Sequence, residues 1–346
     1  MRIMITGGAG FIGSAVVRLV LDETAHEAVV FDNFTYASHL GAMALREQLR
    51  VKVIRGDICD AAAVGACLAQ EKPGAILHLA AETHVDRSID DPSVFVRTNV
   101  TGTQVLLDQA TRYWRTLGAA QAGAFRFHHI STDEVFGSLG RDGFFTEETR
   151  YDPRSPYSAS KAAADHLVRA WHHTYGLPAV LSNCSNNYGP RQYPEKLIPH
   201  LVMRAISGLS LPVYGRGENV RDWLHVDDHA RALLAILTRG TVGQSYNVGG
   251  RCQRTNLAVV ERLCAILDEL APRAGKHADA IAFVTDRPGH DLRYAIDPSK
   301  IERELGWTAR VDFDAGLRET VRWYLDNRAW CDGAAQGGRI GLGATA

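Results

Sequence analysis

The chain opens with a short apolar segment, Arg2–Thr6, that leads directly into a glycine-rich turn. Three glycines follow at a G-x-x-G-x-x-G spacing, namely Gly7, Gly10 and Gly13. Glycine lets the backbone turn tightly and lets its N–H groups approach a bound group closely. The helix expected after the turn directs the positive end of its dipole at the same point. This start restricts the chain to a strand–turn–helix unit suited to the pyrophosphate of a dinucleotide.

A carboxylate that can select the cofactor lies nineteen residues beyond the last of these glycines. Asp32 follows the next predicted strand, 28–31, where it can accept hydrogen bonds from the hydroxyls of an adenosine ribose. A carboxylate at this position repels a 2′-phosphate, so NAD is favoured over NADP. Asp57 and Ile58 follow the third predicted strand and are placed to flank the adenine ring.

Short β-branched runs alternate with amphipathic stretches through the first half of the chain. Helical patterns such as 14–21 and 103–117 lie between the strands. The predicted strands are 2–6, 28–31, 51–54, 75–78, 125–131 and 179–184. This alternation predicts an α/β fold, a doubly wound parallel sheet of the Rossmann type, whose ligands lie at the carboxyl ends of the strands.

The pattern changes after about residue 186, where turn residues multiply and the strands shorten. We expect a smaller C-terminal α/β substrate lobe here, with a helix at 222–238 and a strand at 245–248 returning to the main sheet. The expected division is an NAD-binding domain of 1–185 and 222–250, a substrate domain of 186–221 and 251–330, and a disordered Gly- and Ala-rich tail of 333–346.

The composition argues against several function classes. A net charge of -1, from 38 Lys+Arg against 39 Asp+Glu, gives no electrostatic footprint for nucleic acid or an anionic membrane. No signal-peptide pattern or membrane-spanning run is found. The 6 cysteines lack a C-x-x-C pair, which favours reduced thiols in a cytoplasmic protein. The 14 histidines lack metal-ligand spacing, so no metal is expected.

Polar clusters follow the predicted strands at 80–88 and 131–137, and a third begins a helix at 157–161. Tyr157 and Lys161 are four residues apart and therefore share one helix face. An ammonium beside a phenol lowers the pKa of the phenol. The phenolate can then take the proton of a hydroxyl while a hydride leaves for a nicotinamide. Alone, this pair would be an exposed aromatic and a solvated lysine, but the preceding dinucleotide motif indicates a redox site.

Over roughly residues 1–325 the chain resembles the extended short-chain dehydrogenase/reductases, and within them the sugar-nucleotide 4,6-dehydratases. Phe136 departs from the pattern, because many relatives have tyrosine there. The strings that carry the resemblance are LHLAAETHVDRS at 77–88, STDEVFG at 131–137, NCSNNYGP at 183–190, PEKLIP at 194–199 and RDWLHVDDH at 221–229.

The resemblance implies a redox-neutral lyase that uses bound NAD and acts on dTDP-glucose. The sugar is oxidised at C4, loses water across C5 and C6, and is reduced at C6. By resemblance Tyr157 and Thr132 act on the 4-hydroxyl, Lys161 supports them, Glu134 is the base and Asp133 the acid. Asp133 must then be kept protonated by burial or by a neighbouring negative charge. Taken alone, this carboxylate pair would more simply be a solvated strand end.

The resemblance also implies which residues contact each ligand. Arg221 and Arg287 suit a diphosphate because a guanidinium donates in a fork. Those expected at NAD are Gly7, Gly10, Phe11, Ile12, Gly13, Asp32, Asn33, Thr35, Asp57, Ile58, Ala80, Ala81, His84, Asn99, Tyr157, Lys161 and Asn187. Those expected at the nucleotide sugar are Thr83, Thr132, Asn186, Lys196, Leu197, Pro212, Tyr214, Arg221, Asn256, Arg287 and His290.

Three alternatives stay open at this point. Dehydratases for other nucleotide bases share the same catalytic logic. A UDP-sugar 4-epimerase needs no second acid and base, and such enzymes carry small or hydroxyl residues at Asp133 and Glu134. A cofactor-sensing regulator usually lacks the tyrosine or the lysine, and this chain has both. The resemblance finally implies a homodimer, formed through the helices at 103–117 and 157–175.

Overall fold

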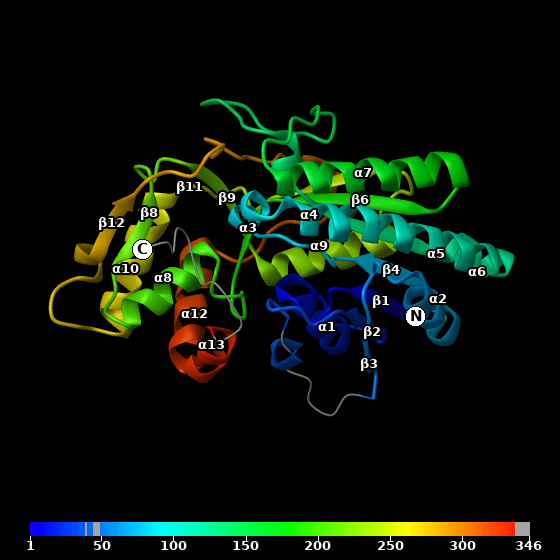
Figure 1. Cartoon of the computed structure of the whole chain (residues 1–346), viewed down its shortest axis with the longest axis horizontal. Helices are drawn as coiled ribbons and strands as arrows, with labels where there is room; N and C mark the ends of the chain where they lie inside the picture. Colours follow the sequence, from blue (N-terminus) through cyan, green and yellow to red (C-terminus); the bar gives the residue numbers. More distant parts are fainter. Residues whose placement is uncertain (39, 44–48, 336–346) are drawn as a thin grey trace.

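The computed structural model describes residues 1–38, 40–43 and 49–335, and a seven-stranded parallel sheet lies at its centre (Figure 1). The strand order is β10-β6-β5-β4-β1-β2-β3, so the order reverses between β1 and β4. The six strands predicted in the first half are confirmed to within one residue at each end. The bounds are β1 (Arg2–Thr6), β2 (Glu27–Asp32), β3 (Val51–Arg55), β4 (Ala75–His78), β5 (Arg126–Thr132), β6 (Ala179–Cys184) and β10 (Ser245–Val248).

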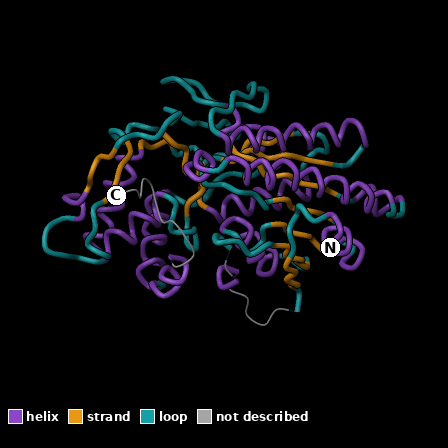
Figure 2. Tube along the Cα trace, viewed as in Figure 1, coloured by secondary structure: helices purple, strands orange, loops and turns teal. Residues whose placement is uncertain are grey.

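Helices cover both faces of this sheet (Figures 1 and 2). Successive side chains of a strand point to opposite faces. Ile3 and Ile5 accordingly pack with α1 and α9, whereas Met4 packs with α2, α5 and α7. The doubly wound sheet is therefore confirmed. The bounds of these helices are α1 (Phe11–Glu23), α2 (Ala61–Glu71), α5 (Thr103–Arg115), α7 (Pro156–Tyr175) and α9 (Val226–Arg239).

Short helical segments complete the loops at the carboxyl end of the sheet and between the long helices. Among them, η2 is a π-helical stretch that continues directly into α5, and η3 is a 3-10 turn that follows β5. Their bounds are η1 (Leu40–Met43), α3 (Val85–Asp90), α4 (Pro92–Phe95), η2 (Val96–Gly102), α6 (Ala119–Ala124) and η3 (Asp133–Phe136).

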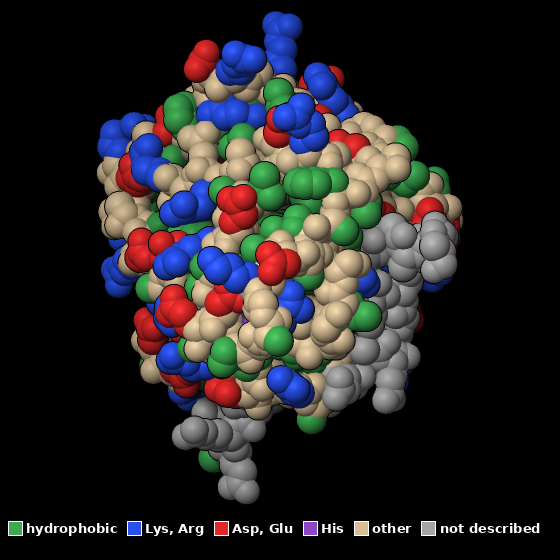
Figure 3. All heavy atoms as spheres, turned by 90° about the vertical axis from the view of Figure 1, so that its left-hand side faces the viewer, with side chains coloured by type: hydrophobic (Ala, Val, Ile, Leu, Met, Phe, Trp, Pro, Cys, Tyr) green, Lys and Arg blue, Asp and Glu red, His purple; other side chains and the backbone are tan. Residues whose placement is uncertain are grey.

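A smaller lobe, on the left in Figure 1, has its own core and two small sheets. Acidic and basic side chains are intermixed on the end of the molecule that Figure 3 shows. The strands are β7 (Asn186–Tyr188), β9 (Val220–His225) and β11 (Gln253–Thr255) in one sheet, and β8 (Leu211–Tyr214) and β12 (Ile281–Val284) in the other. The helices are α8 (Leu197–Ile206), α10 (Asn256–Leu270), η4 (His277–Ala280), α12 (Phe313–Asp326) and α13 (Arg328–Ala335). The helix α11 (Ser299–Leu305) packs instead against β6, β10 and α9 at the edge of the main sheet.

The helix predicted at 222–238 is wrong at its start. Asp222–His225 belong to β9, which pairs with β7 and β11, and the helix begins only at Val226. The pairing with distant strands outweighs the local pattern. The predicted domain boundary between 221 and 222 falls inside this strand, and the two-domain division stays a prediction. Of the predicted tail, α13 includes residues up to Ala335, and 336–346 lie outside the described residues.

The 6 cysteines all lie in the described residues, and none of them forms a disulfide. Within residues 1–38, 40–43 and 49–335, no helix combines the length and the apolar character that a membrane crossing requires. The same part of the chain contains no cluster of three or more His, Cys, Asp or Glu side chains arranged to hold a metal ion.

A buried carboxylate on α9 fastens the segment that leads into the smaller lobe. Asp228 is fully buried, and its Oδ2 accepts hydrogen bonds from the N–H groups of Arg310 and Val311 at 2.9 and 2.8 Å. Its Oδ1 accepts from Arg231 at 2.8 Å. The indole N–H of Trp307 donates to the Asp228 carbonyl. This one residue therefore joins the main sheet layer to the start of α12.

We predict that Asp228→Ala lowers the free energy of unfolding by about 3 kcal/mol, because it removes a fully buried carboxylate and leaves a partly buried arginine and two backbone N–H groups without their acceptor. Chemical denaturation of the variant and the parent measures the difference. Asp227→Ala is the matched control, since the Asp227 side chain is 48% exposed and lies 4.0 Å from Arg18. It should cost less than about 1 kcal/mol. Equal losses of unfolding free energy in the two variants would contradict the stabilising role given to Asp228.

Candidate active site

A cavity of about 470 Å³ follows the carboxyl ends of the parallel strands, where the two lobes meet. Most of the predicted site residues line it. From the NAD set these are Gly7, Gly10, Phe11, Ile12, Gly13, Asp32, Asn33, Thr35, Asp57, Ile58, Ala80, Ala81, Tyr157, Lys161 and Asn187. From the catalytic and substrate sets they are Thr83, Thr132, Asp133, Glu134, Asn186 and Lys196.

The glycine turn leaves room for a bound group against the backbone. Gly7 has a φ of +69°, and a Cβ there would lie 2.7 Å from the N of Ala80. A Cβ on Gly13 would overlap the carbonyl oxygen of Gly7. The helix α1 begins directly after Gly10, which has no side chain to cap it. Its first N–H groups are therefore free to face a pyrophosphate, and the turn fits the diphosphate of NAD.

Asp32 is held by the protein in the position predicted for the ribose contact. It is 5% exposed, and its Oδ2 accepts a hydrogen bond from the N–H of Ala9 at 3.0 Å. Its Oδ1 accepts from Phe34 N–H and from the Ser38 hydroxyl at 2.8 and 2.9 Å. A carboxylate has about four lone-pair sites. Asp32 thus orders the loop after β2 and keeps capacity for a ribose hydroxyl.

The two carboxyl groups of the catalytic cluster enter the cavity from one turn. The strand β5 ends at Thr132, and η3 brings both Asp133 and Glu134 to the cavity wall. The Thr132 hydroxyl accepts from the N–H of Glu134 and donates to Asp133 Oδ1, both at 3.3 Å. Asp133 is 1% exposed, and its Oδ2 has no hydrogen-bond partner among the described residues. That oxygen is available to a substrate.

The surroundings treat the two carboxyl groups differently. Burial raises the pKa of Asp133 well above its ordinary value, and the charges of Glu134 and Asp222 raise it further. Burial also raises the pKa of Glu134, but the nearby cations Arg287, Arg221 and Lys196 act against that rise. A carboxyl crowded by other carboxylates keeps its proton, and one surrounded by cations loses it. The site therefore favours an acid at Asp133 and a base at Glu134.

Tyr157 and Lys161 lie in the first turns of α7, which a Ser155–Ser158 capping box and Pro156 start. Burial raises the pKa of Tyr157 well above its ordinary value, and Glu134 adds to the rise. The ammonium of Lys161 donates to the carbonyl of Ile130 at 2.8 Å. In the chain by itself the net change in the pKa of Tyr157 is therefore a rise, and the expected lowering by Lys161 stays a prediction.

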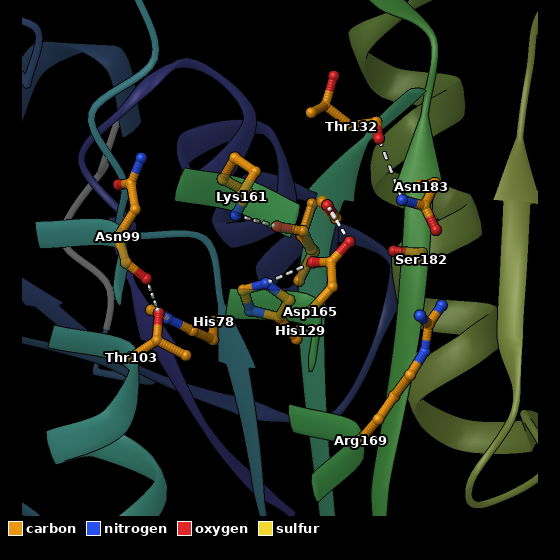
Figure 4. Close-up of polar contacts among 12 residues, drawn as sticks. His78, Asn99, Thr103, His129, Thr132, Lys161, Asp165, Arg169, Ser182 and Asn183 are labelled. Atoms are coloured by element: carbon orange, nitrogen blue, oxygen red, sulfur yellow. Dashed lines mark hydrogen bonds and ion pairs between the residues drawn. The ribbon is translucent and has the colours of Figure 1, made fainter. Parts of the chain in front are cut away.

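A buried carboxylate one turn further along α7 fixes the end of β5. The Oδ2 of Asp165 accepts hydrogen bonds from Ser131 and Tyr151 at 2.8 and 2.9 Å, and Oδ1 lies 3.1 Å from His129 Nε2 (Figure 4). Burial would raise the pKa of Asp165, but His129, the charge of Lys161 and Ser131 outweigh it and lower the pKa. The helix and the strand that carry the catalytic groups thus share one polar network.

Two of the predicted NAD residues do not line the cavity. His84 begins α3, and its Nδ1 accepts from the N–H of Arg87 at 3.3 Å. Asn99 lies in η2, where its Oδ1 accepts from Glu82 N–H at 2.9 Å and its Nδ2 donates to the Ser160 hydroxyl at 2.8 Å. Both fix the loop after β4. Their contact with NAD stays a prediction.

The smaller lobe brings several predicted substrate residues together. Tyr214 donates to Asp86 Oδ2 at 3.3 Å, and Arg287 donates to Oδ1 of the same carboxylate at 3.5 Å. The ring of His290 lies edge-on to Tyr214, with the ring centroids 6.0 Å apart. Arg221 is buried, and the electrostatic effect of its charge on Glu134 places it near the catalytic turn.

Tyr214, Arg221, Arg287 and His290 do not line the cavity, and neither do the remaining three predicted substrate residues. Leu197 begins α8, Asn256 begins α10, and Pro212 is buried in β8. Their role in binding stays a prediction. Sequence reasoning also missed residues that line the cavity, and most of these adjoin the strings that carried the resemblance, where position alone could have found them. They include Glu82, Arg97, Thr98, Ser185, Gln192, Tyr193 and Glu195.

With this geometry established, comparison with known proteins identifies relatives. A family profile described as GDP-mannose 4,6 dehydratase matches residues 4–320. The chain is 55% identical over 333 residues to a dTDP-glucose 4,6-dehydratase of Neisseria gonorrhoeae, covering 94% of this chain and 96% of that protein.

Solved structures show the same fold. A dTDP-glucose 4,6-dehydratase from Streptomyces venezuelae, crystallised with NAD, has a TM-score of 0.88 and 45% identity, covering 96% of this chain and 100% of the other. A UDP-glucose 4-epimerase from Thermus thermophilus, in complex with NAD, has a TM-score of 0.82 and 29% identity, covering 94% and 100%. The chain therefore belongs to the dTDP-glucose 4,6-dehydratases, within the broader family that the GDP-mannose 4,6 dehydratase profile describes.

Proposed function

We infer that the chain converts dTDP-glucose to dTDP-4-dehydro-6-deoxyglucose and water, as a hydro-lyase that uses NAD as a bound catalyst. One observation carries this assignment beyond the fold. Asp133 and Glu134 both reach the cavity that Tyr157 and Lys161 line, where neighbouring carboxylates raise the pKa of Asp133 and neighbouring cations oppose the rise in the pKa of Glu134. An elimination needs this pair, whereas an oxidation followed by a reduction at the same carbon does not.

The residues present suit NAD. The glycine turn would hold its diphosphate, and Asp32 would hold its adenosine ribose. When bound, NAD+ supplies a hydride acceptor and a positive charge. Oxidation then requires a base for the proton of the sugar 4-hydroxyl. We assign that role to Tyr157, with Thr132 orienting the hydroxyl and the Lys161 cation stabilising the phenolate.

The elimination follows from the ketone formed at C4, because a carbonyl acidifies the adjacent C5–H bond. Glu134, as a carboxylate, removes the C5 proton, and the C5–C6 double bond forms as the C6–O bond breaks. Asp133, protonated, gives its proton to the departing C6 oxygen, which leaves as water. A hydride then returns to C6 and a proton returns to C5. Glu134 returns its proton to C5, and the proton that Tyr157 took from the 4-hydroxyl replaces the one that Asp133 lost. All three groups then regain their starting states, and no net oxidation occurs.

A 4-epimerase is the alternative that the fold alone allows, since the Thermus thermophilus enzyme shares it at 29% identity. An epimerase oxidises C4 and returns the hydride to the other face of the same carbon. It has no use for a buried acid with a free oxygen beside a second carboxyl group. The surroundings of Asp133 and Glu134 therefore favour the dehydratase.

For the substrate diphosphate we propose Arg221 and Arg287, because a guanidinium matches two phosphate oxygens at once. Lys196 lines the cavity close by. We further propose that the chain acts in the cytoplasm as a homodimer. The helix α7 exposes Ala159 and Ala170 along one face next to α5, which suits close packing against a second copy.

The decisive experiment is incubation of the purified protein with dTDP-glucose and no added NAD, followed by mass analysis of the product. A product lighter by one water, with no net NADH, supports the proposal. A sugar of unchanged mass would make this chain an epimerase. Turnover of only UDP-, CDP- or GDP-glucose would change the base assignment, because a thymine methyl group contributes only about 1–3 kcal/mol of discrimination.

We predict that Asp133→Asn lowers kcat by about 100-fold or more, because an amide cannot supply the proton that the C6 oxygen needs. The first hydride transfer should survive. NADH absorbance should therefore accumulate on the enzyme after dTDP-glucose is added, which stopped-flow spectroscopy measures. Asp142→Asn, on the exposed segment after η3, is the matched control and should turn over normally. Normal product formation by Asp133→Asn would contradict the assignment of Asp133 as the acid for the C6 oxygen.

The cations around Glu134 lead to a prediction about pH. The base acts only when deprotonated, so activity falls as the pH drops through its pKa. Arg287 holds that pKa down against the effect of burial. Arg287→Gln should therefore move the acid limb of kcat, at saturating substrate, to higher pH by about one unit. Arg154→Gln, which removes a half-exposed arginine paired with Asp152, should leave the limb in place. A shift to lower pH would contradict the assignment.

A further inference from the structure

Three segments that are distant in sequence meet at one buried carboxylate on the rim of the cavity. Glu195 is 2% exposed, and its Oε1 accepts a hydrogen bond from the Tyr36 hydroxyl at 3.1 Å. Its Oε2 lies 3.3 Å from Arg87 Nε. Tyr36 belongs to the loop after β2, Arg87 to α3, and Glu195 to the segment before α8.

The rings and charges of this cluster also stack on each other. The guanidinium of Arg87 lies 3.7 Å from the centre of the Tyr36 ring, a close cation–π contact. Tyr36 also meets Tyr193 edge-on, with the ring centroids 5.3 Å apart. We call Tyr36, Arg87 and Glu195 the rim clasp. None of the three belongs to the catalytic group or to the residues expected at NAD.

The rim clasp joins the two halves of the cavity. The loop of Tyr36 lines the cofactor half through its neighbours Thr35 and Ala37, and Asp32 anchors its end through Ser38. The segment of Glu195 belongs to the smaller lobe and lines the other half. A group bound along the glycine turn would lie beside both of these walls. Moving the loop breaks the hydrogen bond and the stacking of Tyr36.

We propose that Tyr36, fixed by Arg87 and Glu195, is a positioning residue that retains NAD through the catalytic cycle. The proposal rests on the function inferred above. In that reaction a hydride leaves C4 and returns to C6 of the same sugar. A cofactor that escaped between the two transfers would leave the sugar oxidised at C4 and release one NADH. Retention is therefore a requirement of the chemistry, and the rim clasp supplies it.

The test is the dissociation rate of NAD from the purified holoenzyme, measured without sugar by displacement with an excess of labelled NAD. Tyr36→Phe removes one hydrogen bond to a charged acceptor and should speed dissociation about tenfold. Tyr36→Ala also removes both ring contacts and should speed it further. The parent should retain its NAD through gel filtration, and Tyr36→Ala should lose most of it.

Tyr113→Phe is the matched control. The Tyr113 hydroxyl donates to the Pro73 carbonyl at 3.0 Å, on α5 and away from the cavity, so the substitution also removes one tyrosine hydrogen bond. Its NAD dissociation rate should equal that of the parent. Equal acceleration by the Tyr36 and Tyr113 substitutions would mean general loosening and would overturn the proposal. Unchanged dissociation in Tyr36→Phe and Tyr36→Ala would overturn it as well.

Turnover gives a second readout. With dTDP-glucose, Tyr36→Ala should release free NADH and slow progressively unless NAD is added, whereas the parent should do neither. Steady turnover by Tyr36→Ala with no free NADH would overturn the proposal. Tyr36→Phe keeps the shape of the side chain, so it decides the question even if the alanine variant does not fold. The dissociation rate is measured without sugar, so the result of that first test does not depend on the substrate assignment.

Discussion

The catalytic geometry depends on the polar seam that joins α7 to the end of β5. Lys161 and Asp165, one helical turn apart, bond to the backbone of Ile130 and the hydroxyl of Ser131. Neither charge is exposed to solvent, and an isolated buried charge is strongly unfavourable. Each therefore needs the other and its polar partners. The seam fixes Tyr157, on the helix, relative to Thr132, at the strand end, before any ligand binds.

Asp133 and Glu134 are adjacent in sequence, yet their surroundings favour an acid at the first and a base at the second. Geometry alone cannot distinguish Asp133 from Glu134, since the same 3-10 turn brings both to the cavity. Besides the deeper burial of Asp133, part of the distinction comes from charges in the smaller lobe. Its cations Arg221 and Arg287 stabilise the charge on Glu134, while Asp222 adds to the negative field at Asp133. The lobe thus contributes to the acid–base chemistry as well as to substrate binding.

The sequence predicts those parts of the fold that local rules determine. The strands of the main sheet and the glycine turn follow from short-range pattern, and so does the cofactor half of the cavity. Contacts between distant segments do not. The predicted start of α9 is wrong because the residues before Val226 belong to β9, which pairs with strands far away in the chain. Likewise, the spacing places Lys161 on the same helix face as Tyr157, but it does not specify that the Lys161 ammonium donates to the carbonyl of Ile130.

The same limit explains why the rim of the cavity escapes sequence reasoning. Tyr36, Arg87 and Glu195 are separated by 51 and 108 positions, and each alone is an ordinary polar residue. Only the fold makes them neighbours. Yet the chemistry demands some such contact, because a dehydratase that returns its hydride to the sugar must keep one cofactor through two transfers. A parallel sheet exposes that cofactor along the ends of its strands. In this protein the contact comes from the smaller lobe, whose Glu195 bonds to Tyr36 in the loop after β2, beside the open ends of the strands.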